Sequence, residues 1–375
     1  MDVGIVTPRY PPNVQGGGER SAKMLAEQLR NDPRIDRTVV LAFDGSATET
    51  VGGVEVRRLR PVSSTLTEWQ NLRTYGPLAE HAPEFDLLHA YNMELHPAVG
   101  RLASKGVVGT VATLNSYHFL RKSVANATAT GLERAYELVG YPTTGRVLRR
   151  YMGRIDTFVA LSTTVRDIYA DHGLDRGRIE VIPNMYDPSF PVPEVESGAD
   201  GTVRVLNVGE LTARKGVEYL VRAFAELPPG YELRVVGDGP LRSDLERLTA
   251  DLGLGSRVEF AGRIPYEEIA REYATANVFA HPGVWPEPFS RTVVEAMQAG
   301  LPVVSTDVGG HTDVLPSELQ CPSRDPAALA ETIGLAAEDP EGHGRRNREY
   351  VTSELSPAAV VERIVDLYER RLTEP

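Results

Sequence analysis

The sequence predicts an α/β protein of two domains, each built on a parallel β-sheet with helices on both faces. The chain has 375 residues, which is too long for one ordinary core and suits two domains. Short apolar runs alternate with amphipathic runs on both sides of one polar, proline-rich stretch. Such alternation is typical of doubly wound, Rossmann-like sheets, because parallel strands need a crossover that a helix supplies.

The first predicted domain comprises residues 1–187. Its strand-like runs are VGIVT and six others, at 3–7, 37–43, 54–59, 85–90, 107–115, 157–162 and 178–184. Helical patterns are expected between them, including one from about 19 to 30 and one at 163–172. Parallel strands covered on both faces explain why these runs are almost continuously apolar.

Residues 188–201, PSFPVPEVESGADG, form the predicted linker, since they combine prolines, acids and glycine without a hydrophobic period. The second predicted domain, 202–355, restarts the alternation, with strands at 203–209, 231–237, 257–262, 277–283 and 302–306. A final helix is predicted at 356–375, with Ser356 as its N-cap. Its predicted apolar stripe is Val361, Ile364, Val365, Tyr368 and Leu372.

Composition narrows the function classes. The net charge is −12, with +1 in residues 1–190 and −13 in the remainder, so nucleic acid is not expected as a partner. Cys321 is the only cysteine, which excludes an internal disulfide and favours a cytoplasmic setting. The first residues, MDVGIV, do not resemble a secretory leader, and no apolar run is long enough to span a bilayer.

Positive charge is concentrated in residues 117–154 of the first domain. Seven basic side chains oppose only Glu133 and Glu137, and five aromatic residues are interleaved with them. A solvated helical face is one explanation. The alternative is a surface, spanning 121–154, that contacts the inner face of an anionic membrane or an anionic acceptor.

The stretch WPEPFSRTVVEAMQAG, 285–300, contains two acids in a distinctive setting. Two prolines keep Glu287 in a loop, while Glu295 follows inside a predicted helix. Ser290 is the expected N-cap of that helix and Gly300 its C-terminal stop. The free N–H groups at such a helix start favour phosphate, and the carboxylates beside them suit sugar or ribose hydroxyls.

Other strand-to-helix loops contain candidate anion-binding groups. VGELTARKG includes Lys215, the only lysine after residue 122. PPNVQGGGE precedes a helix, and VVGDGP leaves a strand through Gly237. Open α/β sheets bind ligands at the carboxyl ends of their strands, so these loops are expected to line one cleft.

These motifs together resemble the family 4 retaining glycosyltransferases of the GT-B fold. EPFSRTVVEAM is similar to the family's E-x7-E motif, and GELTARKG, VVGDGP, RVEFAGRIP, EAMQAGLPVVSTDVGG and YPPNVQGGGE match in order and spacing. The likeness extends over nearly the whole chain, and it is least between 45 and 85 and between 121 and 150. It implies two Rossmann-like domains that face each other across a cleft, with the last helix, 356–375, crossing back to join the first domain.

The resemblance also implies roles for individual residues. Lys215 and Arg214 would neutralise the diphosphate of a nucleotide-sugar donor, and Glu295 would bind the ribose. The donor sugar would be held by Glu287 and the N–H groups of Phe289 and Ser290. The remaining implied donor-side residues are Arg263 and Ile264 at the base, Gly237 at the nucleotide, and Gly17 and Gly18 at the phosphates.

Three positions depart from the family pattern. Glu210 stands where the family often has arginine, and Ser290 replaces a glycine. TLNSYHF, 113–119, resembles the family's T-L-H-D-Y-W-F segment, so Asn115 occupies the position of a sugar-contacting histidine. His118 lies three residues on. Asn115 and His118 are the candidate acceptor-side residues.

The predicted function is transfer of a sugar, with retention, from a GDP- or UDP-sugar to a hydroxyl of a lipid-linked or glycan acceptor. No metal and no cofactor are expected, because no D-x-D sequence occurs and Lys215 and Arg214 supply positive charge. The alternatives are a disaccharide synthase or phosphorylase with a small soluble acceptor, and a nucleotide-sugar-binding subunit without activity. A nicotinamide oxidoreductase is disfavoured by the missing G-x-G-x-x-G fingerprint.

Overall fold

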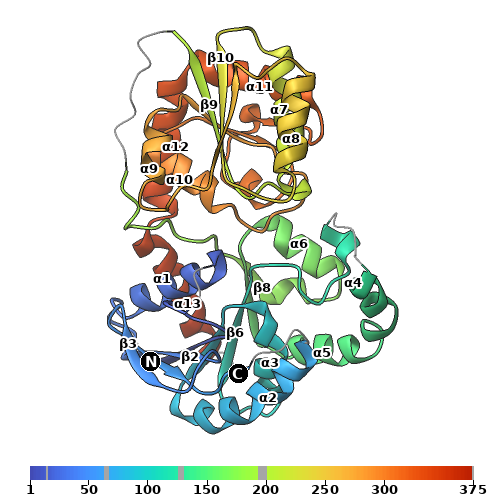
Figure 1. Cartoon of the computed structure of the whole chain (residues 1–375). Coiled ribbons are helices and arrows are strands. Elements are labelled where there is room, and N and C mark those ends of the chain that lie inside the picture. Colours follow the sequence, from blue (N-terminus) through green and yellow to red (C-terminus); the bar gives the residue numbers. More distant parts are fainter. Residues whose placement is uncertain (14–15, 63–66, 126–130, 193–200, 374–375) are drawn as a thin grey trace. The chain divides into compact units, whose positions relative to one another are not determined.

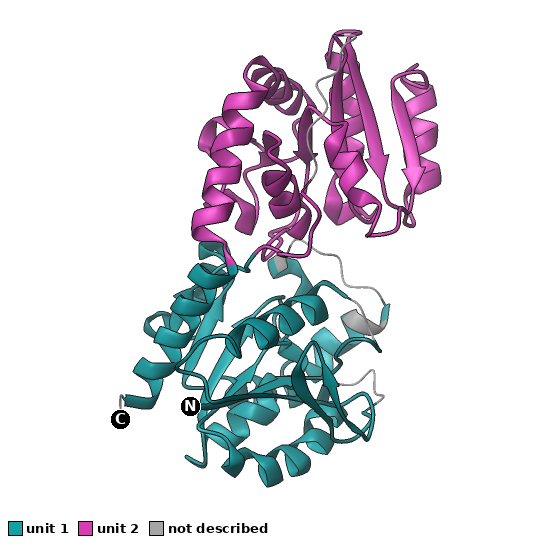
Figure 2. Cartoon of the chain, turned by 90° about the vertical axis from the view of Figure 1, so that its left-hand side faces the viewer, with its two compact units in different colours: residues 1–185, 357–375 teal, residues 186–356 magenta. Residues whose placement is uncertain are grey.

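The computed structural model describes residues 1–13, 16–62, 67–125, 131–192 and 201–373 (Figure 1). The chain divides into two compact units. Unit 1 is Met1–Met185 with Pro357–Pro375, and unit 2 is Tyr186–Ser356 (Figure 2). Residues 193–200 of the predicted linker lie outside the described residues.

The sheet of unit 1 has the order β3-β4-β2-β1-β5-β6-β7-β8. Its strands are β1 (Asp2–Thr7), β2 (Arg37–Ala42), β3 (Thr48–Val51), β4 (Val54–Arg58), β5 (Leu87–Ala90), β6 (Gly109–Leu114), β7 (Thr157–Ala160) and β8 (Ile179–Val181). Every pairing is parallel except β3 with β4. The strand order reverses between β1 and β5, which makes their carboxyl ends the place where this sheet leaves room for a ligand.

Helices cover both faces of this sheet, as the sequence predicts. One face packs against α1 (Gly17–Leu29) and α13 (Pro357–Thr373). The other packs against α2 (Thr67–His81), α3 (His96–Ala103), α5 (Thr144–Met152) and α6 (Thr163–Asp171). A short α4 (Gly131–Ala135) continues into a π-helix, Tyr136–Gly140, before α5.

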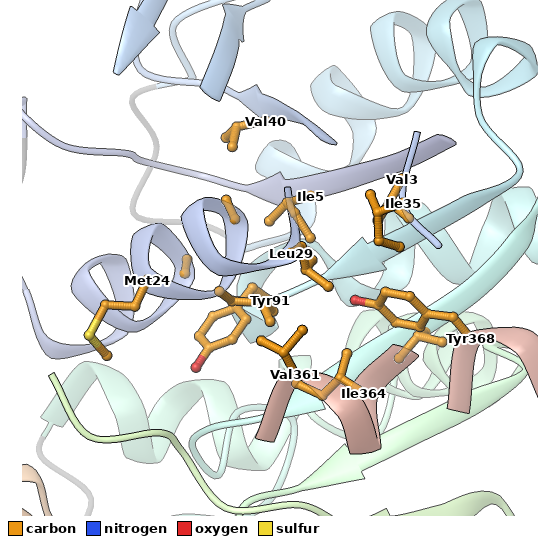
Figure 3. Packing of buried hydrophobic residues seen from close by; sticks show 14 of the residues in the cluster. Val3, Ile5, Met24, Leu29, Ile35, Val40, Tyr91, Val361, Ile364 and Tyr368 are labelled. Atoms are coloured by element: carbon orange, nitrogen blue, oxygen red, sulfur yellow. The ribbon is translucent and has the colours of Figure 1, made fainter. Parts of the chain in front are cut away.

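Helix α13 brings the end of the chain onto the first strands. Val361, Ile364 and Tyr368 point into the cluster formed with Ile5 and Leu29 (Figure 3). The hydroxyl of Tyr368 lies 2.5 Å from Nδ1 of the buried His89, and Arg363 donates to the carbonyl oxygen of Val181. The predicted stripe is wrong at Leu372, which lies in the last turn of α13 and is 40% exposed.

The sheet of unit 2 has the order β11-β10-β9-β12-β13-β14 and is parallel throughout. Its strands are β9 (Val203–Val208), β10 (Tyr231–Val236), β11 (Val258–Gly262), β12 (Val278–His281), β13 (Val303–Thr306) and β14 (Gln320–Cys321). From β9 the chain moves outward through β10 and β11, then returns to the other side of β9 with β12. The strand order therefore reverses between β9 and β12.

Helices also cover both faces of this second sheet (Figure 1). The apolar side chains of α7 (Val217–Glu226), α8 (Arg242–Asp251) and α11 (Pro326–Glu338) form one core with the strands. On the other face lie α9 (Ile269–Ala274), α10 (Arg291–Ala299) and α12 (Pro340–Glu354). None of the helices in the described ranges combines the length and hydropathy needed to cross a bilayer.

Candidate functional site

The loops that follow β9 and β12 meet at the reversal point of the second sheet. After β9 the chain forms a 3₁₀ turn, Ala213–Lys215, and then α7. After β12 it runs through Pro282–Ser290 into α10. The amide N–H of Val284 donates to the carbonyl oxygen of Arg214, so the two loops are hydrogen-bonded to each other.

Lys215 and Glu287, predicted from separate motifs, contact each other directly. The ammonium Nζ of Lys215 lies 2.9 Å from Oε1 and 2.7 Å from Oε2 of Glu287. Both side chains are largely but not fully covered, at 25% and 16% exposed. A charge-assisted pair of this kind is oriented yet still open to solvent.

Two histidines surround the Glu287 carboxylate. Nε2 of His281, the last residue of β12, lies 3.3 Å from Oε2 of Glu287, without the alignment of a hydrogen bond. The ring of His311 packs edge-on against that of His281, with centroids 4.7 Å apart. Both histidines are about 1–2% exposed.

The surroundings lower the pKa of the Glu287 carboxyl well below its ordinary value. Burial by itself raises this pKa, but the imidazole of His281 and the ammonium of Lys215 lower it by more. Glu287 is therefore an ionised acceptor of hydrogen bonds and not a proton donor at neutral pH. The backbone carbonyl of Glu287 is also held, because it accepts from the N–H of Gly310 at 2.7 Å.

Arg214 lies beside Lys215 but points elsewhere. Its guanidinium lies 4.8 Å from the centroid of the Trp285 ring, a cation–π arrangement. A hollow of about 310 Å3 at the start of α7 is lined by Arg214, Gly216, Val284 and Arg324, among others. Two arginines and the free N–H groups of a helix start make this hollow favourable for an anion.

The start of α10 differs in detail from the predicted cap. Ser290 occupies the N-cap position, but its hydroxyl lies 3.3 Å from that of Thr292 and does not cap the helix. Phe289 and Ser290 are both buried. Gly300 ends α10 in the left-handed conformation, at φ 80°, as predicted.

Glu295 is buried on α10 and is already hydrogen-bonded. Oε2 accepts from the hydroxyl of Tyr273 at 3.0 Å, and Oε1 accepts from that of Tyr266 at 3.3 Å. Burial, and then the Glu295 carboxylate, raise the pKa of Tyr273 well above its ordinary value, so this phenol stays a donor. Glu295 is thus a positioned acceptor, not a surface acid.

The other donor-side candidates lie at neighbouring strand ends. Gly237 follows β10 at φ 137°, and a Cβ there would lie 1.9 Å from the carbonyl oxygen of Gly209, so only glycine fits. Arg263, which is exposed, and Ile264 follow β11. Glu210 is also exposed.

Unit 1 contains a separate group at its own reversal point. Gly17 and Gly18 begin α1, and a Cβ on Gly18 would lie 2.8 Å from Oδ1 of Asn92, which follows β5. Asn115 donates to that same Oδ1 at 2.9 Å. His118 is exposed and its Nδ1 lies 2.8 Å from the Ser116 hydroxyl, so it is outside this hydrogen-bonded group.

Sequence reasoning missed His281, His311, Asn92 and the two tyrosines that contact Glu295. His281 sits at the carboxyl end of an apolar run, NVFAHPG, which is the one signal that could have identified it. A second cavity, about 660 Å3, lies away from these groups. Its lining includes Arg204, Arg234, Arg271 and Glu272, toward the amino ends of the strands, so we do not assign the candidate site there.

Two family models match this chain. The model for glycosyltransferase family 4 matches residues 15–190, and the model for glycosyl transferases group 1 matches residues 194–352. Between them, the two models extend over most of both units.

Curated relatives are also glycosyltransferases. An uncharacterized glycosyltransferase of Methanocaldococcus jannaschii is 27% identical over 334 residues, which cover 85% of this chain and 84% of the relative. The 2-deoxystreptamine glucosyltransferase of Streptomyces kanamyceticus is 32% identical, covering 60% of this chain and 62% of the relative. The GDP-mannose-dependent alpha-(1-6)-phosphatidylinositol monomannoside mannosyltransferase of Mycolicibacterium smegmatis is 27% identical, covering 70% and 79%.

Solved structures share the fold. Sucrose-phosphate synthase of Thermosynechococcus elongatus superposes with a TM-score of 0.76 at 22% identity, covering 99% of this chain and 98% of that one. Anabaena HepE, in complex with UDP-glucose, gives a TM-score of 0.72 at 20% identity, covering 98% and 99%. At these identities the likeness establishes the GT-B architecture and nothing about substrates.

Proposed function

Because this chain belongs to the family 4 glycosyltransferases of the GT-B fold, we propose that it moves a sugar, with retention, from a nucleoside diphosphate sugar to an acceptor hydroxyl. The observation that carries the proposal is the Lys215–Glu287 pair at the reversal point between β9 and β12. The ammonium of Lys215 would pair with the leaving group, and the ionised carboxylate of Glu287 would accept hydrogen bonds from the sugar. The two groups are hydrogen-bonded to each other.

In this proposal the donor occupies the carboxyl edge of the second sheet. Lys215 and Arg214 neutralise the diphosphate as its bond to the sugar breaks, which replaces a metal ion in that role. Glu287 accepts hydrogen bonds from the donor sugar, together with the N–H groups of Phe289 and Ser290. Glu295 faces the ribose, and the loop of Arg263 and Ile264 borders the base.

The proposed reaction is a front-face displacement. The bond between the anomeric carbon and the diphosphate oxygen breaks, the acceptor oxygen bonds to the same face of that carbon, and the acceptor proton passes to the departing phosphate. Positive charge develops on the sugar ring in the transition state, and the ionised Glu287 stabilises it electrostatically. Glu287 is an orienting group and not a covalent nucleophile.

The names of several relatives support a nucleotide sugar as the donor. Anabaena HepE is bound to UDP-glucose, and the mycobacterial relative is GDP-mannose-dependent. The group of Asn115, Gly17 and Gly18 in unit 1, with the nearby His118, is the proposed acceptor side.

A lipid-linked or glycan acceptor at a membrane surface is the proposed acceptor class. The observation that favours it is an apolar and basic surface on unit 1, here called the docking surface. It consists of the exposed residues Trp69, Leu72, Arg73, Leu138, Val139, Arg146, Val147 and Arg150. All five of its apolar side chains are more than half exposed, from Leu138 at 73% to Trp69 at 53%.

Contacts beneath the docking surface join its three elements. The Thr144 hydroxyl at the start of α5 donates to Glu68 at the start of α2, at 2.7 Å. Tyr136 of the π-helix is adjacent, and burial together with the Glu68 carboxylate raises its pKa to about 12. Residues distant in sequence thus form one exposed region, where apolar side chains can enter a lipid headgroup layer while arginines attract anionic lipid.

The internal contacts of residues 117–154 reduce the basic patch predicted from sequence. The guanidinium of Arg149 lies 3.7 Å from the Tyr141 ring centroid and donates to the Tyr141 carbonyl oxygen. The charge of Arg149 is therefore engaged in contacts within the protein. Residues 126–130 of the patch lie outside the described residues. The second candidate acceptor, a small soluble molecule, is supported by the name of the 2-deoxystreptamine glucosyltransferase, which is 32% identical to this chain.

A thermal-shift screen with UDP-, GDP- and ADP-sugars tests the donor assignment. A ligand at 100 times its Kd stabilises the folded state by about 2.7 kcal/mol, which raises Tm by several degrees. We expect one base to produce this shift, and radiolabelled sugar from that donor to appear on lipid extracts. Stabilisation without any transfer would favour the non-catalytic binding subunit, and no shift with any donor would contradict the proposed function.

A further inference from the structure

The ammonium of Lys215 has two assigned partners. In the structure it contacts both oxygens of the Glu287 carboxylate, and in the proposed function it neutralises the donor diphosphate. A lysine that turns toward a phosphate weakens its hold on the carboxylate. Glu287 is mostly buried, and a buried carboxylate without a partner is costly. Some other donor is needed to keep Glu287 ionised and oriented at that stage.

His281 is placed to be that donor. Its ring is 2% exposed, and its Nε2 atom lies 3.3 Å from Oε2 of Glu287. The alignment is not that of a hydrogen bond while Lys215 holds the carboxylate. A small rotation of the carboxylate after Lys215 leaves would bring it into line.

His311 holds the ring of His281 in place. Nε2 of His311 lies 3.1 Å from the carbonyl oxygen of Thr306. Since a carbonyl only accepts, Nε2 carries the hydrogen, and the tautomer is determined. Burial, and next the proximity of His281, lower the pKa of His311 to about 3, so this ring is neutral. It packs against His281 without adding positive charge beside it.

We propose that His281 is a positioning residue for Glu287, whose Nε2–H holds Oε2 when Lys215 engages the diphosphate, and that His311 positions the His281 ring. This inference rests on the proposed function, which assigns the sugar to Glu287 and the diphosphate to Lys215. The titratable or charged groups that face Glu287 are Lys215 from the β9–α7 loop, His281 from β12 and His311 from the 3₁₀ turn Gly310–Asp313.

Paired substitutions at position 281 separate a donor from a space-filling ring. His281→Gln keeps an N–H near the Nε2 position, whereas His281→Leu removes it. We expect His281→Leu to lower kcat about 10- to 100-fold, the range for losing a hydrogen bond to a charged group. The KM for the donor should change little, because the nucleotide contacts are untouched. His281→Gln should retain kcat within about threefold.

The pH profile supplies a readout that a purely structural role would not move. With His281 gone and Lys215 on the diphosphate, the pKa of Glu287 in the donor complex rises toward the ordinary carboxyl value. The acid limb of kcat, which reports that complex, therefore moves to higher pH in His281→Leu only. His343→Leu is the matched control, a buried histidine on α12 outside the site. Equal losses of kcat in His281→Leu, His281→Gln and His343→Leu, with the acid limb of the pH profile unchanged in all three, would overturn the proposal.

Long-range ¹H–¹⁵N spectra of selectively labelled histidines test the pairing without any turnover. We expect His281 to carry a hydrogen on Nε2, with a shift that changes in Glu287→Gln, and His311 to stay the neutral Nε2–H form at pH 5. A bare Nε2 on His281, or no response to Glu287→Gln, refutes the pairing. If the pairing is seen but no donor sugar is turned over by the unaltered protein, the proposed function fails and not the pairing.

Discussion

The ion pair between Lys215 and Glu287 is a single contact between two loops that are 72 residues apart in sequence. Each side chain keeps some exposure, so solvent screens part of the attraction. The pKa of Glu287 is lowered in the folded protein by His281 and Lys215 acting against burial. The stabilisation it provides is therefore present above the ordinary carboxyl pKa and is lost as the pH falls through the lowered one.

We predict that Lys215→Ala lowers kcat about 100- to 1000-fold, as expected for removing one group that stabilises developing charge. Glu287→Gln should produce a loss of similar size with less change in Tm, since it leaves no unpaired carboxylate. Steady-state kinetics with the donor found by thermal shift, and circular dichroism for the fold, measure both effects. Near-normal turnover in either folded variant would contradict the assignment of the site.

At the scale of elements, helices α2 and α5 each bury one face in unit 1 and expose the other, while the π-helix between α4 and α5 has no buried residue. The buried face of α5 includes Leu148 and Met152, and the exposed face includes Arg146, Val147 and Arg150. Most surface apolar residues on a soluble protein are scattered singly. Here Trp69, Leu138 and Val147 come from three elements joined through Glu68, which is why we infer a docking surface.

Charge reversal on this surface is expected to weaken membrane binding. Each arginine near an anionic surface contributes about 1 kcal/mol, so the double variant Arg146→Glu, Arg150→Glu should bind phosphatidylglycerol vesicles at least 10-fold less tightly. Sedimentation with such vesicles at low and high salt measures this, and salt should weaken binding by the unaltered protein.

The matched control for this experiment is the double variant Arg247→Glu, Arg345→Glu, which changes net charge equally with exposed residues of unit 2. It should bind vesicles like the unaltered protein, with its fold intact. Binding that is absent, independent of salt, or reduced equally by the control would favour a small soluble acceptor.

At the scale of the whole molecule, the chain leaves unit 1 after Met185 and returns to it at Pro357. The returning helix α13 buries six apolar side chains, among them Val361, Ile364 and Tyr368. At roughly 1.5–3 kcal/mol for each large side chain, this burial is comparable to the net stability of a domain. The hydrophobic core of unit 1 is thus complete only when α13, the last helix of the chain, has packed onto it.

We predict that Ile364→Ala lowers the free energy of unfolding of unit 1 by about 2–5 kcal/mol, the usual cost of a buried cavity. Leu372→Ala, on the same helix but 40% exposed, should change it by less than about 0.5 kcal/mol. Urea unfolding followed by circular dichroism measures both. Equal effects would mean that α13 does not form part of the unit 1 core.

The sequence by itself determined the two parallel sheets, the succession of strands and helices along the chain, and the loops that carry Lys215, Glu287 and Gly237. These features are local, because apolar periodicity, prolines and glycines act on their own segments. Two strands were missed for local reasons. β3 pairs antiparallel with β4 through Gly52 and Gly53, both at positive φ, in a two-residue hairpin within a short polar run. β14 is only two residues long.

Only the tertiary structure decided which of these groups meet. Nothing in the sequence places Nζ of Lys215 against both oxygens of Glu287, surrounds Glu295 with Tyr266 and Tyr273, or sets His311 against His281. Such contacts depend on strand order and on the packing of distant elements, and a local pattern contains no information about either. The sequence singled out the Glu287 carboxylate, but only the tertiary structure brings it to 3.3 Å from Nε2 of His281, at the end of β12.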